Sequence, residues 1–325
     1  MKKFIVVLFL LLMTVNVHAG NINRLIFFGD SLSDDGNLYK ITLHLIPKSP
    51  PYYKGRFTNG ETWAEYVGKH YRHYKIYALG GATAVSLKPL DSSIPTLNLE
   101  LEVYRYLGES LFKNRSNSLF TIWIGGNDYL FNPNADVDSA TTKVIDQISW
   151  AIKTLRKNGG KNFLILNLPD LSLIPRIRGS QSENQLHALT ILHNQKLDAM
   201  IQDLQNSYSD IHITFFNIHN NISDFLTNPE KYNTKYNTHV TQLTEACWKG
   251  EVWLRPDKSQ PRAITGMTSL SPSLMETFAV NESYMKGNIP CANPDDYFFW
   301  DGVHPSAIAH NILGQMIIEE LATVF

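Results

Sequence analysis

The sequence is poor in three features that would each indicate a particular class of protein. Its 325 residues include two cysteines, and 29 lysine and arginine residues nearly balance 30 aspartate and glutamate residues. A nucleic-acid-binding domain normally carries a clear basic excess, so the balanced charge excludes this class. After the apolar stretch at residues 4–15, no second run is long enough to span a bilayer. We therefore expect a soluble mature chain.

The first nineteen residues have the pattern of a secretory signal peptide. A basic start, MKK, precedes the apolar run FIVVLFLLLMTV, and VHA before Gly20 is a small-residue cleavage site. A membrane anchor is the alternative, but a bilayer span needs about 20 apolar residues and this run is shorter. We expect cleavage after Ala19, a secreted protein, and a domain over residues 20–325.

The two cysteines, Cys247 and Cys291, both lie late in the chain. In an exported protein an even number of cysteines favours a disulfide, and two free thiols are the alternative. His70 and His73 lack partner ligands, so zinc is not expected, and the acidic pair at residues 34–35 does not match a calcium loop. We expect neither a metal nor a cofactor.

Apolar runs alternate with amphipathic segments along the chain. The runs predict buried strands at residues 25–28, 75–79, 118–125, 162–168 and 211–218. Segments that begin at residues 141, 183 and 305 have apolar residues at helical spacing. In the last segment this spacing directs Ile308, Ile312, Met316 and Leu321 inward, and Pro305 suits the first turn of the helix. This alternation predicts an α/β fold, with a mostly parallel, doubly wound sheet covered by helices on both faces.

Residues 225–295 break this rhythm. They are rich in Asn, Thr, Ser, Pro and Lys and contain both cysteines, and a structureless stretch of this length is unusual inside a compact domain. We interpret them as a disulfide-tied insertion or lid. Within it, Trp248, Trp253 and Leu254 could contact an acyl chain, although tryptophans in an insertion also pack its own small core.

Residues of the types that catalyse acyl transfer follow several predicted strands. Ser31 lies in GDSLSDDGN after the first strand, Asn127 in GGNDY after the third, and Asp301 three residues before His304 in FFWDGVHPS. A serine hydroxyl becomes nucleophilic when a histidine takes its proton and a carboxylate orients that histidine. Because ligands bind at the carboxyl ends of parallel strands, we expect these groups to meet there.

The second predicted strand ends in LGGAT, which offers a donor for a negatively charged oxygen. Glycine lets its backbone N–H approach closely, and an asparagine amide such as that of Asn127 is a suitable side-chain donor. Each of these short motifs also occurs in ordinary turns, tight packing or helix caps. Their order and their shared position after strands favour a serine hydrolase.

Nearly the whole mature chain resembles the GDSL lipases and esterases, also called SGNH hydrolases. The matching blocks are FFGDSLSDDGN, GRFTNGETWAEYV, YALGGATA, GGND, NLPDLSLIP and WDGVHPS. The resemblance implies a three-layer α/β/α, flavodoxin-like fold. It assigns Ser31 as nucleophile, His304 as base and Asp301 as its partner. It also assigns the oxyanion donors to the backbone N–H groups of Ser31 and Gly81 and to the Asn127 side chain.

The blocks are most similar to those of secreted bacterial lysophospholipases A and glycerophospholipid–cholesterol acyltransferases. This implies a phospholipid or lysophospholipid substrate, transient contact with a membrane surface, and transfer to an alcohol such as cholesterol in competition with hydrolysis. Alternatives are a carbohydrate acetyl-esterase of the same family and a non-catalytic adhesion protein. A further hypothesis is that the stretch between the cysteines is a lid that an activating protease nicks.

Overall fold

A central sheet of five parallel strands forms the middle layer of the protein. The computed structural model describes residues 22–86, 97–111, 113–254, 280–283 and 289–325. The strands run in the order β2-β1-β3-β4-β5. Their bounds are β1 Arg24–Gly29, β2 His73–Ile76, β3 Ser118–Trp123, β4 Asn162–Leu166 and β5 His212–Phe216. Every pairing between neighbours is parallel, as the apolar runs predict.

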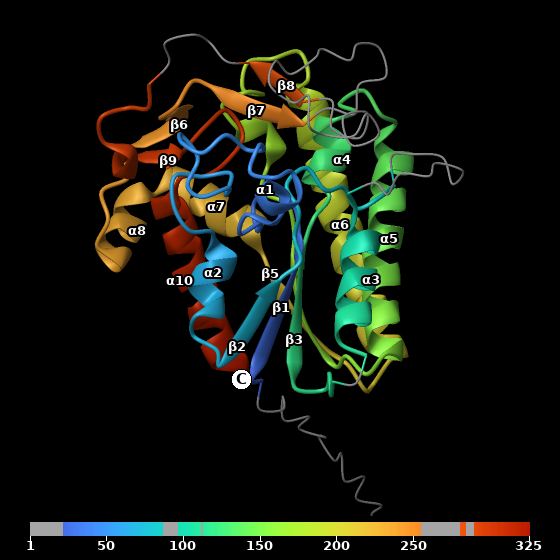
Figure 1. Cartoon of the computed structure of the whole chain (residues 1–325). Helices are drawn as coiled ribbons and strands as arrows, with labels where there is room; N and C mark the ends of the chain where they lie inside the picture. Colours follow the sequence, from blue (N-terminus) through green and yellow to red (C-terminus); the bar gives the residue numbers. More distant parts are fainter. Residues whose placement is uncertain (1–21, 87–96, 112, 255–279, 284–288) are drawn as a thin grey trace, which may run out of the picture.

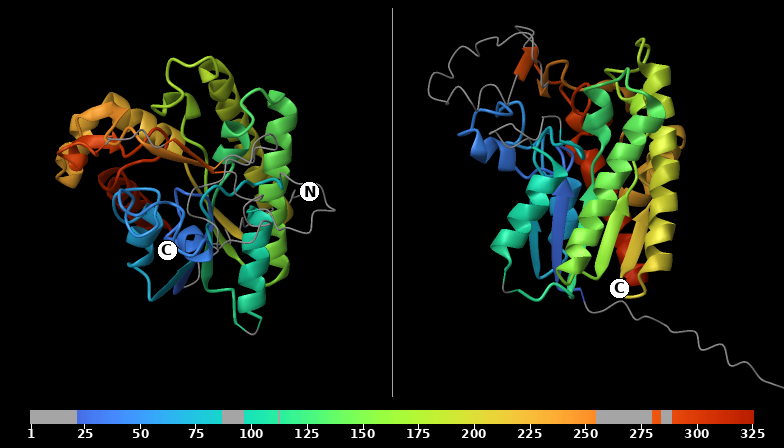
Figure 2. Two further views of the ribbon diagram at one scale, coloured as in Figure 1. Left: turned by 45° about the horizontal axis from the view of Figure 1, so that its top comes forward. Right: turned by 90° about the vertical axis from the view of Figure 1, so that its right-hand side faces the viewer.

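Helices cover both faces of this sheet, which confirms the predicted α/β class and its three layers (Figure 1). One face carries α3 (Leu99–Glu109), α5 (Val137–Lys157) and α6 (Glu183–Ser207), and α5 packs against both of the others. The other face carries α2 (Trp63–Gly68) and α10 (Ala307–Val324), which pack together. Views from two other directions show the same layering (Figure 2).

Two predicted boundaries differ from the structure. Strand β2 covers residues 73–76 rather than 75–79. Beyond it, the Tyr77 and Leu79 N–H groups still donate to backbone carbonyls of β1. Helix α10 begins at Ala307 with Ser306 as its N-cap, so Pro305 lies before the helix and not in its first turn. Ile312 and Leu321 are buried as expected, whereas Ile308 and Met316 are partly buried.

The segment predicted to break the rhythm begins with regular structure. Helices α7 (Ile218–Thr227) and α8 (Pro229–Tyr236) and strand β6 (Gln242–Ala246) continue the fold, and Phe225 and Val240 are buried in the main core. Strand β6 pairs in parallel with β9 (Tyr297–Phe299), and β7 (Glu251–Leu254) pairs antiparallel with β8 (Val280–Ser283). Where this segment is described, at residues 225–254, 280–283 and 289–295, it includes short helices and strands and is not a single loop.

A disulfide joins Cys247 to Cys291, as the sequence predicts. Most of the stretch between the two cysteines lies outside the described residues, so the lid hypothesis stays a prediction. The Cys247 N–H donates to the Phe299 carbonyl and the Trp248 N–H donates to the Trp300 carbonyl. The disulfide-bonded segment therefore runs beside the chain that leads into Asp301. Among the described helices, none combines the length and apolar composition needed to cross a bilayer.

Candidate active site

Ser31, His304 and Asp301 meet at the carboxyl end of the sheet. His304 Nε2 lies 2.8 Å from Ser31 Oγ, and His304 Nδ1 lies 2.8 Å from Asp301 Oδ2. All three residues are buried, with exposed fractions of 8%, 5% and 0% for serine, histidine and aspartate. The structure thus joins two segments that are 273 residues apart in the sequence.

The local backbone explains why each side chain points to this place. Strand β1 ends at Gly29, and the N–H groups of Ser33 and Asp34 then close a tight turn on the Asp30 carbonyl. Ser31 lies at the start of that turn. His304 lies on the loop before α10, and its carbonyl accepts from the Trp300 N–H, so the imidazole is free to reach across the sheet.

The Asp301 carboxylate is held by several donors. Its Oδ1 accepts the N–H groups of Val303 and His304, at 2.8 and 2.7 Å, and its Oδ2 accepts the Tyr52 hydroxyl at 2.5 Å. Burial raises the pKa of Asp301, but the His304 imidazole and these hydrogen bonds outweigh burial and hold that pKa below its usual value. Because an ionised carboxylate can only accept, His304 Nδ1 carries a hydrogen and Nε2 accepts from Ser31.

Tyr52 and Phe57 are partners that the sequence motifs do not single out. The Phe57 ring lies 5.2 Å from the His304 ring, between centroids, and the Tyr52 ring packs edge-on against Trp248. Trp248 also stacks on Trp300, so it belongs to a small core behind Asp301. Of the two roles considered for Trp248, the structure shows packing in a small core and no contact with the cavity. The Trp253 and Leu254 side chains lie outside the described residues.

The three predicted oxyanion donors are placed differently with respect to the cavity. Ser31 and Asn127 both line it, whereas Gly81 does not. Asn127 Nδ2 donates to the Ala82 carbonyl at 2.9 Å, which ties helix α4 (Gly126–Leu130) to the glycine pair. The Gly80 N–H donates to Asp34 Oδ2 at 2.7 Å. Within the described part of the chain, no acceptor contacts the N–H of Ser31 or Gly81.

Buried carboxyl groups surround the turn that carries Ser31. Glu102 Oε2 accepts the Gly29 N–H, and Asp30 Oδ1 accepts the Leu32 N–H. Burial raises the pKa of Asp30 to about 6 and that of Asp128 to about 7, and it raises the pKa of Glu102 well above its usual value. Asp128 accepts the backbone N–H groups of Ala84 and Val85 and so supports the chain beside the glycine pair.

A helix directly after Ser31 would be expected to direct the partial positive charge of its N-terminus at the developing negative oxygen, but the structure does not place one there. Helix α1 (Asn37–Ile41) is short and begins six residues after Ser31, so its N-terminus cannot be directed at the Ser31 hydroxyl from an adjacent turn. At the start of helix α1, the Asp34 carboxylate accepts the N–H groups of Gly36, Asn37 and Leu38. A carboxylate, rather than the substrate, therefore occupies the start of this helix.

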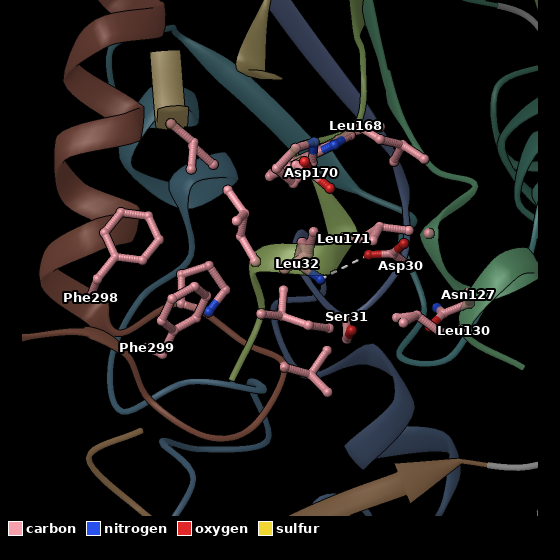
Figure 3. A pocket seen from close by; sticks show the side chains of 18 of the residues that line it. Asp30, Ser31, Leu32, Asn127, Leu130, Leu168, Asp170, Leu171, Phe298 and Phe299 are labelled. Carbon is pink, nitrogen blue, oxygen red and sulfur yellow. Dashed lines mark hydrogen bonds between the residues drawn. The ribbon is translucent and has the colours of Figure 1, made fainter. Parts of the chain in front are cut away.

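An apolar cavity opens beside Ser31 (Figure 3). Its empty volume is about 710 Å³, part of which is open to solvent. Ser31, Asn127 and Leu130 lie on one side of it, and Phe298 and Phe299 lie on the opposite side. The other apolar lining residues include Leu32, Trp123, Leu168, Leu171, Leu173, Ile174, Ile222, Leu226 and Val303. Within the described residues, no group of three or more His, Cys, Asp or Glu side chains is arranged to hold a metal.

Comparison with known proteins agrees with the arrangement of the motifs. The GDSL-like lipase/acylhydrolase family model matches residues 25–317. The chain belongs to the GDSL lipase/acylhydrolase family. It is 30% identical to a phosphatidylcholine-sterol acyltransferase of Aeromonas hydrophila, over 97% of this chain and 96% of that protein. It is 25% identical to a thermolabile hemolysin of Vibrio parahaemolyticus, over 92% of this chain and 63% of that protein.

The solved structures that resemble this GDSL family member are more distant from it in sequence. The native aryl esterase of Mycobacterium smegmatis matches with a TM-score of 0.45 and 14% identity, over 93% of this chain and all of that one. Est24, a carbohydrate acetylesterase from Sinorhizobium meliloti, matches with a TM-score of 0.40 and 15% identity, over 93% of this chain and all of that one. These matches carry no argument about the substrate.

Proposed function

We propose that the protein is a secreted serine ester hydrolase that cleaves the acyl esters of lysophospholipids and phospholipids. The observation that carries this proposal is the hydrogen-bonded row of Ser31, His304 and Asp301 at the edge of an apolar cavity. A hydroxyl, an imidazole and a carboxylate in this order form the proton-handling chain of acyl transfer.

The reaction proceeds in two half-reactions. Ser31 Oγ attacks the ester carbonyl carbon while its proton passes to His304 Nε2, and Asp301 stabilises the resulting imidazolium. The Ser31 N–H, the Asn127 amide and the Gly81 N–H stabilise the negative oxygen. The proton then passes to the departing alcohol, which leaves an acyl group on Ser31. Water releases the fatty acid, and an alcohol such as cholesterol competes with water for the same acyl group.

The cavity supports a long acyl chain over a short one. Its lining is mostly apolar, as expected of a site that holds a hydrocarbon chain. A second apolar cavity of about 370 Å³ shares Trp123, Ile222 and Phe298 with the first. Two apolar cavities with shared lining residues suit a hydrocarbon chain better than an acetyl group, in keeping with the name of the acyltransferase relative from Aeromonas.

Turnover of lysophosphatidylcholine tests the proposal. The wild-type protein should release fatty acid, and Ser31→Ala should release it at least about 1,000-fold more slowly, because an attacking oxygen is lost. Ser33→Ala is the matched control, because it removes another buried hydroxyl from the same turn. The Ser33 hydroxyl accepts from the Trp63 indole N–H and does not contact His304. Turnover that survives in Ser31→Ala, or a wild-type protein inactive on every phospholipid, would refute the proposal.

Export is part of the same proposal. It rests on the residues before Gly20, which lie outside the described residues. N-terminal sequencing of protein recovered from the culture medium should begin at Gly20; a chain that keeps Met1 and stays with the cells would contradict it.

A further inference from the structure

Two apolar side chains are exposed on the segment that leads from helix α1. Ile41 at the end of α1 is 43% exposed and Leu43 is 65% exposed. Helix α1 lies at the end of the molecule where the parallel strands have their carboxyl ends (Figure 1), and it projects from that end in the rotated view (Figure 2). Two large apolar side chains are thus exposed to water at the end of the sheet that carries the site.

Backbone hydrogen bonds fix this exposure. The His44 N–H donates to the Tyr39 carbonyl at 2.7 Å, and the Ile46 N–H donates to Thr42 Oγ1 at 3.1 Å. Leu43 and His44 have positive φ values of 54° and 67°. A leucine in this left-handed conformation costs roughly 1–2 kcal/mol, and strain of this kind concentrates at functional sites. The turn therefore presents Leu43 outward at an energetic cost.

The same segment carries positive charge. Residues 36–60 contain Lys40, Lys48, Lys54 and Arg56 and no aspartate or glutamate, although the whole chain has a net charge of −1. The three lysines are exposed. Arg56 is paired with Glu65, and Lys40 interacts with the half-buried Asp35, so these two cations are partly balanced by acids from outside the segment.

The segment is physically connected to the active site. Tyr52 donates to Asp301 and the Phe57 ring packs against the His304 ring. Gly55 packs against Tyr39, where a Cβ atom would lie 2.3 Å from the Tyr39 Cβ, so the segment closes back on α1. Leu43 therefore belongs to a segment whose other residues contact Asp301 and His304, at the same end of the sheet.

We propose that Ile41, Leu43 and the lysines around them form a docking surface for a lipid bilayer that contains anionic lipids. Exposed apolar side chains insert among acyl chains, and lysines are attracted to a negative bilayer surface. A bilayer fits better than a protein partner because the apolar area is small and lies on a segment that carries exposed lysines and no acidic residue. The proposal rests on the proposed function, since the substrate lipid would reside in that bilayer.

Vesicle sedimentation with the full Ser31→Ala chain tests the surface without consuming the lipid. Vesicles of phosphatidylcholine mixed with phosphatidylglycerol should bind the protein more tightly than vesicles of phosphatidylcholine alone, and added salt should weaken binding. Leu43→Asp should weaken binding at least about tenfold. Lys40→Gln combined with Lys54→Gln should weaken it about fivefold per lysine.

Matched controls come from the opposite end of the sheet. Leu111 is 67% exposed and lies between α3 and the start of β3, so Leu111→Asp removes a comparable apolar side chain there. Lys113→Gln with Lys157→Gln makes the same change in charge as the lysine pair above. Aspartate adopts positive φ more readily than leucine, so Leu43→Asp should fold, which circular dichroism checks. The controls should bind vesicles like the parent.

Each outcome decides the proposal. Binding that is unchanged in Leu43→Asp, that falls equally in Leu111→Asp, or that ignores vesicle charge overturns it. Fatty-acid release by the wild-type protein from micellar lysophosphatidylcholine reports on the proposed function separately. Release without vesicle binding refutes the docking surface alone, and vesicle binding without release refutes the ester hydrolase alone.

Discussion

The Tyr52 hydroxyl donates to Asp301 Oδ2, the oxygen that also accepts from His304 Nδ1. Tyr52→Phe removes this donor, so the pKa of Asp301 should rise toward its usual value and the carboxylate should lose a restraint on its position. We expect kcat to fall roughly tenfold, in line with the loss of a hydrogen bond to a charged group, and the acid limb of the pH–rate profile to move to higher pH.

Tyr53→Phe is the control for this prediction, because Tyr53 is the adjacent, half-buried tyrosine whose ring contacts Lys54 and Arg56. A merely structural role for Tyr52 would lower thermal stability with no movement of the pH profile. An unchanged profile and an unchanged kcat in Tyr52→Phe would show that the hydroxyl does not position Asp301.

Asp30 gives a prediction about stability and pH. Burial raises the pKa of Asp30 to about 6, while the unfolded chain releases the same proton near its ordinary pKa of 3.8. Unfolding between these values releases a proton, so rising pH favours the unfolded state in that window. Asp30→Asn keeps an acceptor for Leu32 and removes the titration. Its free energy of unfolding relative to wild type should improve by roughly 1–3 kcal/mol between pH 4 and pH 7.

Urea denaturation of both proteins across this range measures the difference directly. Comparison with the variant cancels the contributions of the other carboxyl groups, some of which have lowered pKa values and act in the opposite direction. Parallel stability curves for the two proteins would show that Asp30 titrates in the folded state as it does in the unfolded chain.

Sequence motifs predicted that Ser31, His304 and Asp301 belong to the site, but they did not predict the residues that position these side chains. Ser31, Asn127 and His304 stand in short motifs after apolar runs, so their position at strand ends could be predicted. Tyr52 stands in a proline-rich stretch without periodicity, and its partner Asp301 is 249 residues away in the sequence. No local pattern reports such a contact. Its one sequence signal is proximity to the GRFTNG block.

Among the elements, helix α1 and the glycine pair depend on one side chain. Asp34 Oδ1 accepts from Gly36, and its Oδ2 accepts from Leu38 and Gly80. Asp34→Asn would set an NH₂ group against N–H donors, leaving buried donors unpaired at a cost of about 1–3 kcal/mol each. We expect a lower urea midpoint and, because Gly80 adjoins Gly81, slower ester turnover.

Asp35→Asn makes the same chemical change one residue later, where the Asp35 carboxyl makes no hydrogen bond to the glycine pair, and it serves as the control. Equal urea midpoints together with equal turnover for Asp34→Asn and the wild-type protein would contradict the role assigned to Asp34. Turnover that falls in Asp34→Asn with an unchanged midpoint would separate a local effect on the oxyanion donors from a loss of the fold.

Strands β1, β3 and β4 were predictable to within a few residues because they are buried and mostly apolar, whereas β2, with three exposed residues out of four, was placed less well. Helix ends were less predictable, since they depend on side-chain caps. Proline suits a first turn, yet the Ser306 side chain accepts the Ala309 N–H and sets the start of α10. Short strands such as β6 and β9 have too few residues for a period to be read.

At the scale of the whole molecule, the fold joins segments that are remote in sequence. The parallel sheet brings the ends of β1 and β3 to one edge, and the small β6–β9 sheet directs the chain from Phe299 into Asp301. The disulfide at Cys247 fixes the segment that packs beside it. The Asn59 side chain accepts the Ala307 N–H at 2.7 Å, which secures the start of α10 just after His304.

Covalent labelling of the full chain with a fluorophosphonate, read by mass spectrometry, tests the central claim most directly. The phosphorus should bond to Ser31 Oγ with loss of fluoride, and His304→Ala should label far more slowly because the hydroxyl loses its base. The account predicts a single adduct on the peptide that contains Ser31, with ester turnover lost in proportion. A protein that keeps its ester turnover while unlabelled at Ser31 would contradict it.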